Sequence, residues 1–185
     1  MTRPTPHRGA AAPCGQADLP RAKFDVGAGV LVRRLLPGDA DSLAQNCLPQ
    51  MPLDEVREIV AEDLIEQERG SGLTLVAEAH GQIAATLKMT RQGPEAWLHN
   101  VSAASAFRGR GLVPRMIGLL ADHLRRTGAA RLSAHVRADN RAARRAYEKA
   151  GMRCAAADGM RGEQLRYVLD LAPDGEAAQP GEPGQ

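Results

Sequence analysis

The sequence is poor in aromatic residues and cysteine, and it contains no long apolar run. Aromatic side chains make up only 3% of the 185 residues, so Ala, Leu, Val and Met must fill the core. No apolar stretch approaches the roughly 20 residues that a membrane-spanning helix needs, which argues against a membrane protein. Cys14, Cys47 and Cys154 form no C-x-x-C motif. Their odd number favours reduced thiols and predicts a cytoplasmic protein.

The sequence also lacks a strong charge imbalance and the common nucleotide-binding motifs. A formal net charge of +2 with 25% charged residues does not indicate a nucleic-acid-binding protein. No Gly-Lys-Ser/Thr triplet is present, which argues against a Walker loop for ATP or GTP. A dinucleotide-binding fingerprint would require a third glycine where the chain has Pro114. No set of metal ligands stands out.

The length suits one domain with a single core. Residues 1–28 contain several prolines and no hydrophobic periodicity, and residues 173–185 are similar in composition. Both segments are predicted to be disordered. The domain is therefore expected to span residues 29–172.

A basic loop between a strand and a helix is the most informative stretch. The segment from Trp97 to Thr127 reads as a short strand, the sequence Arg108-Gly109-Arg110-Gly111, and an amphipathic helix. Unpaired N–H groups and the helix dipole converge with two arginines where that helix begins, which favours a phosphate or pyrophosphate. A solvated basic loop with ordinary turn glycines is the alternative.

The next segment repeats the strand and helix pattern. A strand is predicted at 131–136, followed by a helix with Asp139 or Asn140 as its N-cap and Gly151 at its end. Tyr147 falls on the inward face of this helix. Two successive strand–helix units imply a parallel pair of strands with a right-handed crossover.

Strands and helices alternate over the rest of the domain. A short helix is expected before Pro49 and a long one from Asp54 to Gly70. The remaining strands are predicted at 30–36, 73–79, 82–89, 95 onward, 153–156 and 164–171. This order predicts a mixed α/β sheet of six or seven strands in a three-layer arrangement with about four helices.

Two motifs resemble those of the GNAT superfamily of acyl-CoA-dependent N-acetyltransferases. Its pyrophosphate loop, Gln/Arg-x-x-Gly-x-Gly/Ala, is matched from Arg108 to Val113, and its second signature is matched at Asn140, Ala143, Tyr147 and Gly151. The second segment looks like that of ribosomal-protein alanine acetyltransferases. Val113 replaces a small residue and Pro114 removes one N–H donor, so we expect a weakened but retained site.

The resemblance implies the residues that bind acetyl-CoA. The backbone of the central strand would pair with the pantetheine arm, and the loop would bind the pyrophosphate. The implied cofactor-binding residues are Val101, Ala103, Arg108, Gly109, Arg110, Gly111, Leu112, Val113 and Asn140. Tyr147 would protonate the departing thiolate, although a core tyrosine is the simpler reading of an Ala-rich helix face.

An amine that attacks a thioester needs a base, because it must lose a proton. His99 and His135 are the candidates, since imidazole can accept a proton at neutral pH. The resemblance supports both, because family members carry a glutamate at the corresponding places. Glu78, Glu95 or a chain of water molecules are alternatives.

The resemblance implies a direct acetyl transfer from acetyl-CoA to a primary amine, with a small molecule as the favoured acceptor. Alternative functions are acetylation of a protein N-terminus and non-catalytic sensing of acyl-CoA. By analogy of fold, Gln50, Met51, Arg161 and Glu163 are expected near the acceptor. The arginines at 137, 141, 144 and 145 read as a solvated face rather than a nucleic-acid site. A monomer and a homodimer both remain open.

Overall fold

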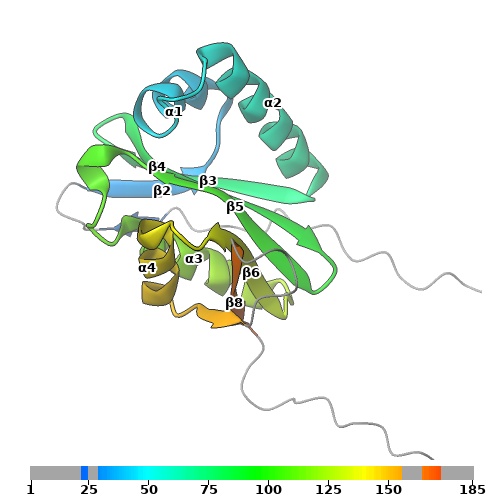
Figure 1. Ribbon diagram of the computed structural model, residues 1–185. Coiled ribbons are helices and arrows are strands. Elements are labelled where there is room, and N and C mark those ends of the chain that lie inside the picture. Colours follow the sequence, from blue (N-terminus) through cyan, green and yellow to red (C-terminus); the bar gives the residue numbers. More distant parts are fainter. Residues whose placement is uncertain (1–21, 25–28, 156–163, 172–185) are drawn as a thin grey trace, which may run out of the picture.

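A single mixed sheet runs through the molecule (Figure 1). The computed structural model describes residues 22–24, 29–155 and 164–171. The sheet has eight strands in the order β1-β2-β3-β4-β5-β6-β8-β7. Their bounds are β1 Ala22–Phe24, β2 Val30–Arg34, β3 Gly72–Ala79, β4 Gln82–Gln92, β5 Glu95–Ala103, β6 Arg131–Arg137, β7 Arg153–Ala155 and β8 Gln164–Asp170.

The first five strands form an antiparallel meander, and β5 and β6 form the parallel pair. His80 and Gly81 have positive φ angles of 52° and 74° at the β3–β4 turn, which is typical of the two-residue turns of tight hairpins. The helix α3, Leu112–Arg126, provides the crossover from β5 to β6. These pairings confirm the predicted hairpin and the predicted parallel pair.

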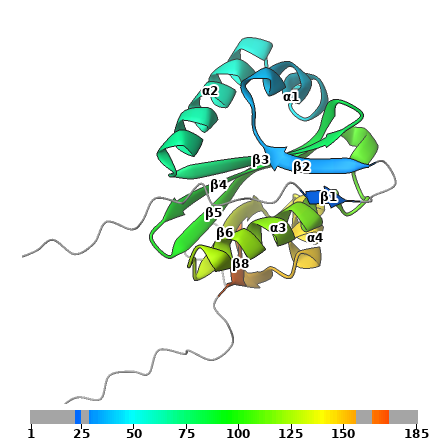
Figure 2. The same ribbon diagram turned by 180° about the vertical axis from the view of Figure 1, so that it is seen from behind.

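Helices cover both faces of the sheet (Figures 1 and 2). On one face lie α1, Ala40–Asn46, and α2, Leu53–Arg69. On the other lie α3 and α4, Arg141–Lys149. The short 3-10 helices η1, Pro37–Asp39, and η2, Ser105–Phe107, precede α1 and follow β5. The predicted three-layer mixed α/β arrangement with four helices is therefore confirmed.

Two apolar clusters hold the layers together. The larger one packs α3 on the sheet through Met116, Ile117, Leu120 and Leu124, all fully buried, and α4 through Tyr147. The smaller one lies under α1 and α2 and includes Leu43, Val56, Val60, Val76 and Ile83. As predicted from a core with few aromatic residues, aliphatic side chains fill most of both clusters.

Strand β1, at one edge of the sheet, is the element that the sequence did not predict. Ala22–Phe24 pairs with β2, although residues 1–28 are predicted from composition to lack regular structure. The other parts of that predicted arm, 1–21 and 25–28, lie outside the described residues, as does the predicted tail 173–185. None of the described helices is long and apolar enough to cross a membrane.

The central parallel pair separates at one end. Pairing between β5 and β6 stops at Leu98 and Ala134, so β5 from His99 onward has no described strand beside it on that side. At the same point β5 bulges against β4, and Asn100 takes a left-handed conformation with φ of 47°. Asparagine tolerates this conformation better than most residues. The sheet therefore opens at the end of β5.

Candidate active site

The basic loop has the shape that its glycines allow. Gly109 and Gly111 have φ angles of 76° and 78°, a conformation that costs residues with a Cβ atom roughly 1–2 kcal/mol. Gly111 is the N-cap of α3, so the unpaired N–H groups of the first helical turn lie directly after the loop. The Arg108 side chain donates from Nε to the carbonyl of Ala103 at 3.1 Å. This contact ties the loop to the end of β5.

The start of α4 lies beside the start of α3. Asn140 caps α4, because its side-chain oxygen accepts a hydrogen bond from the Ala143 N–H at 3.1 Å. The predicted capping role of Asn140 is thereby confirmed, and its side-chain NH₂ group remains available to a ligand. Two helix N-termini therefore face one region, which favours an anion there.

A cavity of about 550 Å³ occupies this region, and we call it the cofactor pocket. Its cationic lining residues are Arg108, Arg145 and Lys149, and no carboxylate lines it among the described residues. The predicted cofactor-binding residues that line it are Val101, Ala103, Arg108, Gly109, Gly111, Leu112, Val113 and Asn140. Arg110 is not a lining residue; its guanidinium group lies over the Phe107 ring, 5.6 Å from the centroid.

The departures from the family loop do not disturb the start of α3. Pro114 is the third residue of the helix, where its missing N–H would have no helical partner. Val113 lines the pocket with its side chain partly buried. The loop thus keeps its helix N-terminus, with one donor fewer.

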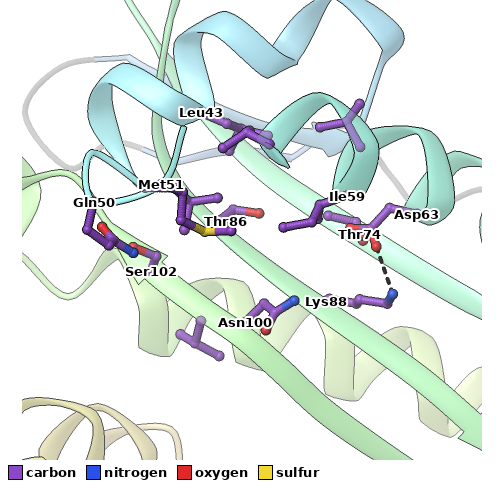
Figure 3. Close-up of a pocket in the computed structure, with 14 residues that line it drawn as sticks. Leu43, Gln50, Met51, Ile59, Asp63, Thr74, Thr86, Lys88, Asn100 and Ser102 are labelled. Atoms are coloured by element: carbon purple, nitrogen blue, oxygen red, sulfur yellow. Dashed lines mark hydrogen bonds and ion pairs between the residues drawn. The ribbon is translucent and has the colours of Figure 1, made fainter. Parts of the chain in front are cut away.

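A second cavity, of about 320 Å³, lies on the opposite face of the sheet, and we call it the acceptor pocket. Figure 3 shows one wall made by Leu43 of α1, Met51 of the connection between α1 and α2, and Ile59 of α2. Strands β4 and β5 supply a polar floor of Thr86, Lys88, Asn100 and Ser102. Gln50 and Met51 line this pocket, whereas Arg161 and Glu163 lie outside the described residues.

Charged side chains form a network at one end of the acceptor pocket. The Lys88 Nζ atom lies 2.7 Å from Asp63 Oδ1 and 2.8 Å from Glu66 Oε2. Thr74 donates its hydroxyl to the other Asp63 oxygen at 2.8 Å. Burial works against the Lys88 ammonium, but the contacts with Asp63 and Glu66 outweigh it and raise the Lys88 pKa. Lys88 is therefore cationic at neutral pH.

This network was not predicted from the sequence. Asp63 follows Val56 and Val60 at helical spacing in α2, so it falls within the apolar stripe that faces the sheet. A carboxylate in such a stripe needs a buried partner, so the position of Asp63 in the sequence indicates that a buried ion pair exists. The partner, Lys88, lies on a strand 25 positions later and could not be identified from local pattern.

The two pockets meet at the open end of β5. Val101 and Ser102 line both cavities. The Ser102 hydroxyl donates to the Cys47 carbonyl at 2.6 Å, which fixes this part of β5 against the end of α1. A ligand on each face of the sheet could therefore approach the other at Val101 and Ser102.

The two predicted histidines lie on the face of the sheet that carries the acceptor pocket, but neither lines a pocket. His99 Nε2 is 2.9 Å from the Thr90 hydroxyl. Partial burial, followed by the charge of Lys88, lowers the His99 pKa, so this imidazole is neutral at pH 7. The exposed His135 ring lies 5.1 Å from the ring of Trp97.

Tyr147 is buried in the larger core, with 4% of its surface exposed. Its ring centroid lies 5.6 Å from that of Tyr167. It is not a lining residue of the cofactor pocket, but Ala143, one helical turn earlier, is. Burial raises the Tyr147 pKa, so the phenol stays protonated at neutral pH.

Neither of the two described cysteines is placed as a nucleophile in the pockets. Cys47 is buried, and burial raises its pKa to about 11. A thiol that remains protonated at neutral pH is a poor nucleophile. Cys154 is an exposed free thiol that does not line either pocket.

Most of the other charged candidates have partners. Glu95 accepts from Arg166 at 2.6 Å and from the Ser133 hydroxyl at 2.8 Å, and Glu78 accepts from Arg33 at 2.8 Å. Both glutamates, named above as alternative bases, are therefore engaged with arginines. In the arginine group, Arg137 pairs with Asp139, Arg144 donates to the Ala138 carbonyl, and Arg145 lines the cofactor pocket.

Comparison with solved structures shows the same fold. A GNAT-family protein from Desulfovibrio desulfuricans aligns with a TM-score of 0.66 and 21% identity, covering 77% of this chain and 99% of that one. An acetyltransferase from Salmonella typhimurium that modifies the N-terminal serine of ribosomal protein L7/L12 aligns with a TM-score of 0.66 and 18% identity, covering 78% and 96%. The microcin C7 self-immunity acetyltransferase MccE, in complex with acetyl-CoA and AMP, aligns with a TM-score of 0.67 and 15% identity, covering 82% and 98%.

Comparison of sequences identifies the family. No curated protein sequence matches the chain. The profile described as "Acetyltransferase (GNAT) family" matches residues 41–152. This range includes both pockets, from Leu43 in α1 to Lys149 in α4. The chain belongs to the GNAT family of acetyltransferases.

Proposed function

We propose that this acetyltransferase moves an acetyl group from acetyl-CoA directly to the primary amine of a small molecule. The observation that carries the proposal is that the cofactor and acceptor pockets lie on opposite faces of the sheet and share Val101 and Ser102. An acetyl donor on one face and an amine on the other would be held at one point. Such positioning is a large part of catalysis when two substrates react.

The cofactor pocket has the features that coenzyme A requires. Helix N-termini and the cations Arg108, Arg145 and Lys149 favour phosphate groups. The unpaired edge of β5 beyond Leu98 can hydrogen-bond an extended chain as an added strand would. MccE, which has the same fold, binds acetyl-CoA. Bound acetyl-CoA would supply the activated acetyl group.

The acceptor pocket favours a small molecule. Its volume of about 320 Å³ is near the lower end for small-ligand sites, and α1 and α2 cover it. A protein N-terminus is the alternative acceptor. We also propose a reducing compartment, the cytoplasm, because Cys47 and Cys154 are free thiols.

Four groups have proposed roles in the transfer. The backbone N–H groups of Val101 and Ala103 on β5 hydrogen-bond the bound acetyl-CoA. Tyr147, whose phenol is protonated at neutral pH, supplies the proton to the departing sulfur. His99 is our preferred base, because its lowered pKa leaves it neutral and able to accept the amine proton. His135 is the second choice.

Tyrosine variants test this proposal. Acetyl-CoA at about 100 times its dissociation constant should raise the melting temperature of the parent by roughly 5 to 10 °C, and the parent should release thiol with a primary amine. Tyr147→Phe should keep the shift and lose at least roughly tenfold in kcat. Tyr167→Phe is the matched control, because its hydroxyl hydrogen-bonds Glu148 and Arg144, and its kcat should stay within about twofold of the parent.

Three outcomes would count against the proposal. Absence of an acetyl-CoA shift, with ATP and NADPH as comparison ligands, would reject the cofactor assignment. A shift without turnover toward any amine would favour a sensor of acyl-CoA. Equal kcat in the parent and Tyr147→Phe would leave the transferase intact and remove Tyr147 from the mechanism.

A further inference from the structure

We infer that the acceptor pocket selects its amine by charge, and that the substrate class is an alkyl diamine whose second amino group remains protonated. Amines with a carboxylate in place of that group would be poor acceptors. The inference rests on the proposed function, because it assigns the cavity beside Val101 and Ser102 to the acceptor. It deepens that function by naming the chemistry of the far end of the acceptor.

The charges at the far end of the pocket do not cancel. Asp63 and Glu66 each contribute one negative charge and Lys88 one positive charge, which leaves a net charge of −1. Asp63 and Lys88 are the only ionisable side chains among the described residues that line the pocket. Glu66 does not line the pocket; it contacts Lys88 at 2.8 Å, and 36% of its side chain is exposed. The network that a ligand in this cavity approaches therefore carries a net negative charge.

The network is rigidly placed. Only 6% of the Asp63 side chain and 15% of the Lys88 side chain are exposed, and Thr74 holds the second Asp63 oxygen. Glu66 lies across Gly72, where an added Cβ would come within 2.7 Å of Glu66 Oε2. The absence of a side chain at Gly72 thus allows Glu66 to reach Lys88.

The network lies at the end of the acceptor pocket opposite Ser102, where the two pockets meet. Figure 3 shows Ser102 and Gln50 at one end of the pocket, and Asp63 and Thr74 at the other, with Lys88 joined to Asp63. An amine that reacts beside Ser102 would extend its remaining chain along Met51 and Ile59 toward Asp63. The apolar wall suits a methylene chain, and the charged end suits an ammonium group.

The effect should be measurable, because few water molecules screen charges inside a pocket covered by two helices. One unit charge several ångströms from the network, at an effective dielectric constant of about 20, changes binding by roughly 10- to 100-fold. A carboxylate would be disfavoured by a similar factor. A simpler role for the network is to fasten α2 to β4, and in that case the charge of the acceptor would not matter.

The test uses three acceptors of equal length that differ only at the far end: 1,4-diaminobutane, 4-aminobutan-1-ol and 4-aminobutanoate, repeated with three- to six-carbon chains. With saturating acetyl-CoA, kcat/KM should be highest for the diamine, roughly tenfold lower for the amino alcohol and lowest for the amino acid. Glu66→Gln makes the network neutral while preserving the Asp63–Lys88 pair. It should reduce the preference for diamine over amino alcohol to within about threefold.

Glu68→Gln is the control, because it removes the same charge from an exposed position two residues further along α2. Its acceptor preference should equal that of the parent. Equal kcat/KM for the three acceptors, or preference for the amino acid, would overturn the charge selection while leaving the transferase function in place. A parent that binds acetyl-CoA but acetylates none of the three series would overturn the diamine assignment. Loss of acetyl-CoA binding itself would instead reject the proposed function.

Discussion

The cofactor pocket and the acceptor pocket are built on different principles. The cofactor pocket comes from two segments, residues 101–114 and 140–149, each of which includes the start of a helix. Its charges are cations without carboxylates in the lining. The acceptor pocket combines two helices and three strands, from Leu43 to Ser102, and its charges are paired with one another. A site made from local backbone geometry can be read from a motif, whereas a site made from tertiary contacts cannot.

The two regions should also differ in what a substitution damages. In the cofactor pocket, cations and helix N-termini are placed to bind an anion of a ligand, so substitutions there should mainly affect ligand affinity. In the acceptor pocket, Asp63 and Lys88 satisfy each other inside the folded chain, so changes there should mainly affect stability. The following predictions test this contrast.

The largest expected effect is on stability, from Asp63→Ala. The substitution leaves the Thr74 hydroxyl without its partner and leaves Lys88 paired with Glu66 alone. Breaking a buried ion pair is strongly destabilising, and we expect a loss of about 3 kcal/mol in the free energy of unfolding. Urea denaturation measures this loss. The dissociation constant of acetyl-CoA should stay within about twofold of the parent value.

Asp54→Ala is the matched control in the same helix. Asp54 pairs with Arg57 at 3.3 Å, but 92% of its side chain is exposed, so the loss should be below about 0.5 kcal/mol. Equal losses for both variants would show that the Asp63 pair does not hold α2 on the sheet. A large change in acetyl-CoA affinity for Asp63→Ala would contradict the expectation that substitutions in the acceptor pocket mainly affect stability.

The second effect concerns affinity, from Gly111→Ala. With φ at 78°, alanine strains the loop, and relief of that strain would move the N–H groups that face the pocket. We expect acetyl-CoA to bind roughly 10- to 30-fold more weakly, measured by calorimetry. Gly128→Ala is the control, because Gly128 has φ of 75° at the other end of the same helix and open space around it.

Gly128→Ala should lose about 1 kcal/mol of stability and keep its affinity for acetyl-CoA. If both glycine variants weakened binding equally, the loss would reflect general damage to α3. The loop would then have no special part in binding. If neither weakened it, the cofactor would have to be held elsewhere.

Features that depend on local geometry could be predicted from the sequence, whereas features that depend on tertiary contacts could not. The strands other than β1, the four helices, the parallel crossover and the caps at Gly70 and Asn140 all depend on local spacing, and the structure confirms them. The Asp63–Lys88 pair depends on where α2 lies over β4, which no local pattern contains. Arg110 is implied by the resemblance as a cofactor-binding residue, and the position of its guanidinium group over the Phe107 ring is likewise a contact that the motif does not predict.

The smallest expected effect is on the titration of His99. Its pKa is lowered by burial and by the charges of Lys88 and His135, and is raised by Glu66. We therefore expect it to titrate below its ordinary value of about 6.5 and to be neutral, and competent as a base, at pH 7. NMR titration of the histidine ring protons, with His99→Gln to assign the signal, measures this directly.

Glu66→Gln removes the negative charge that favours the protonated imidazole, so the His99 pKa should fall further, while Glu68→Gln should leave it unchanged. Such a shift would show that the charged network of the acceptor pocket acts electrostatically on the proposed base. The cofactor pocket would have no part in this coupling. A His99 pKa at or above the ordinary value would mean that the imidazole is partly protonated at pH 7. Burial and the charge of Lys88 would then not control this imidazole, the coupling between the network and the proposed base would be rejected, and the acceptor pocket would control only which amine binds.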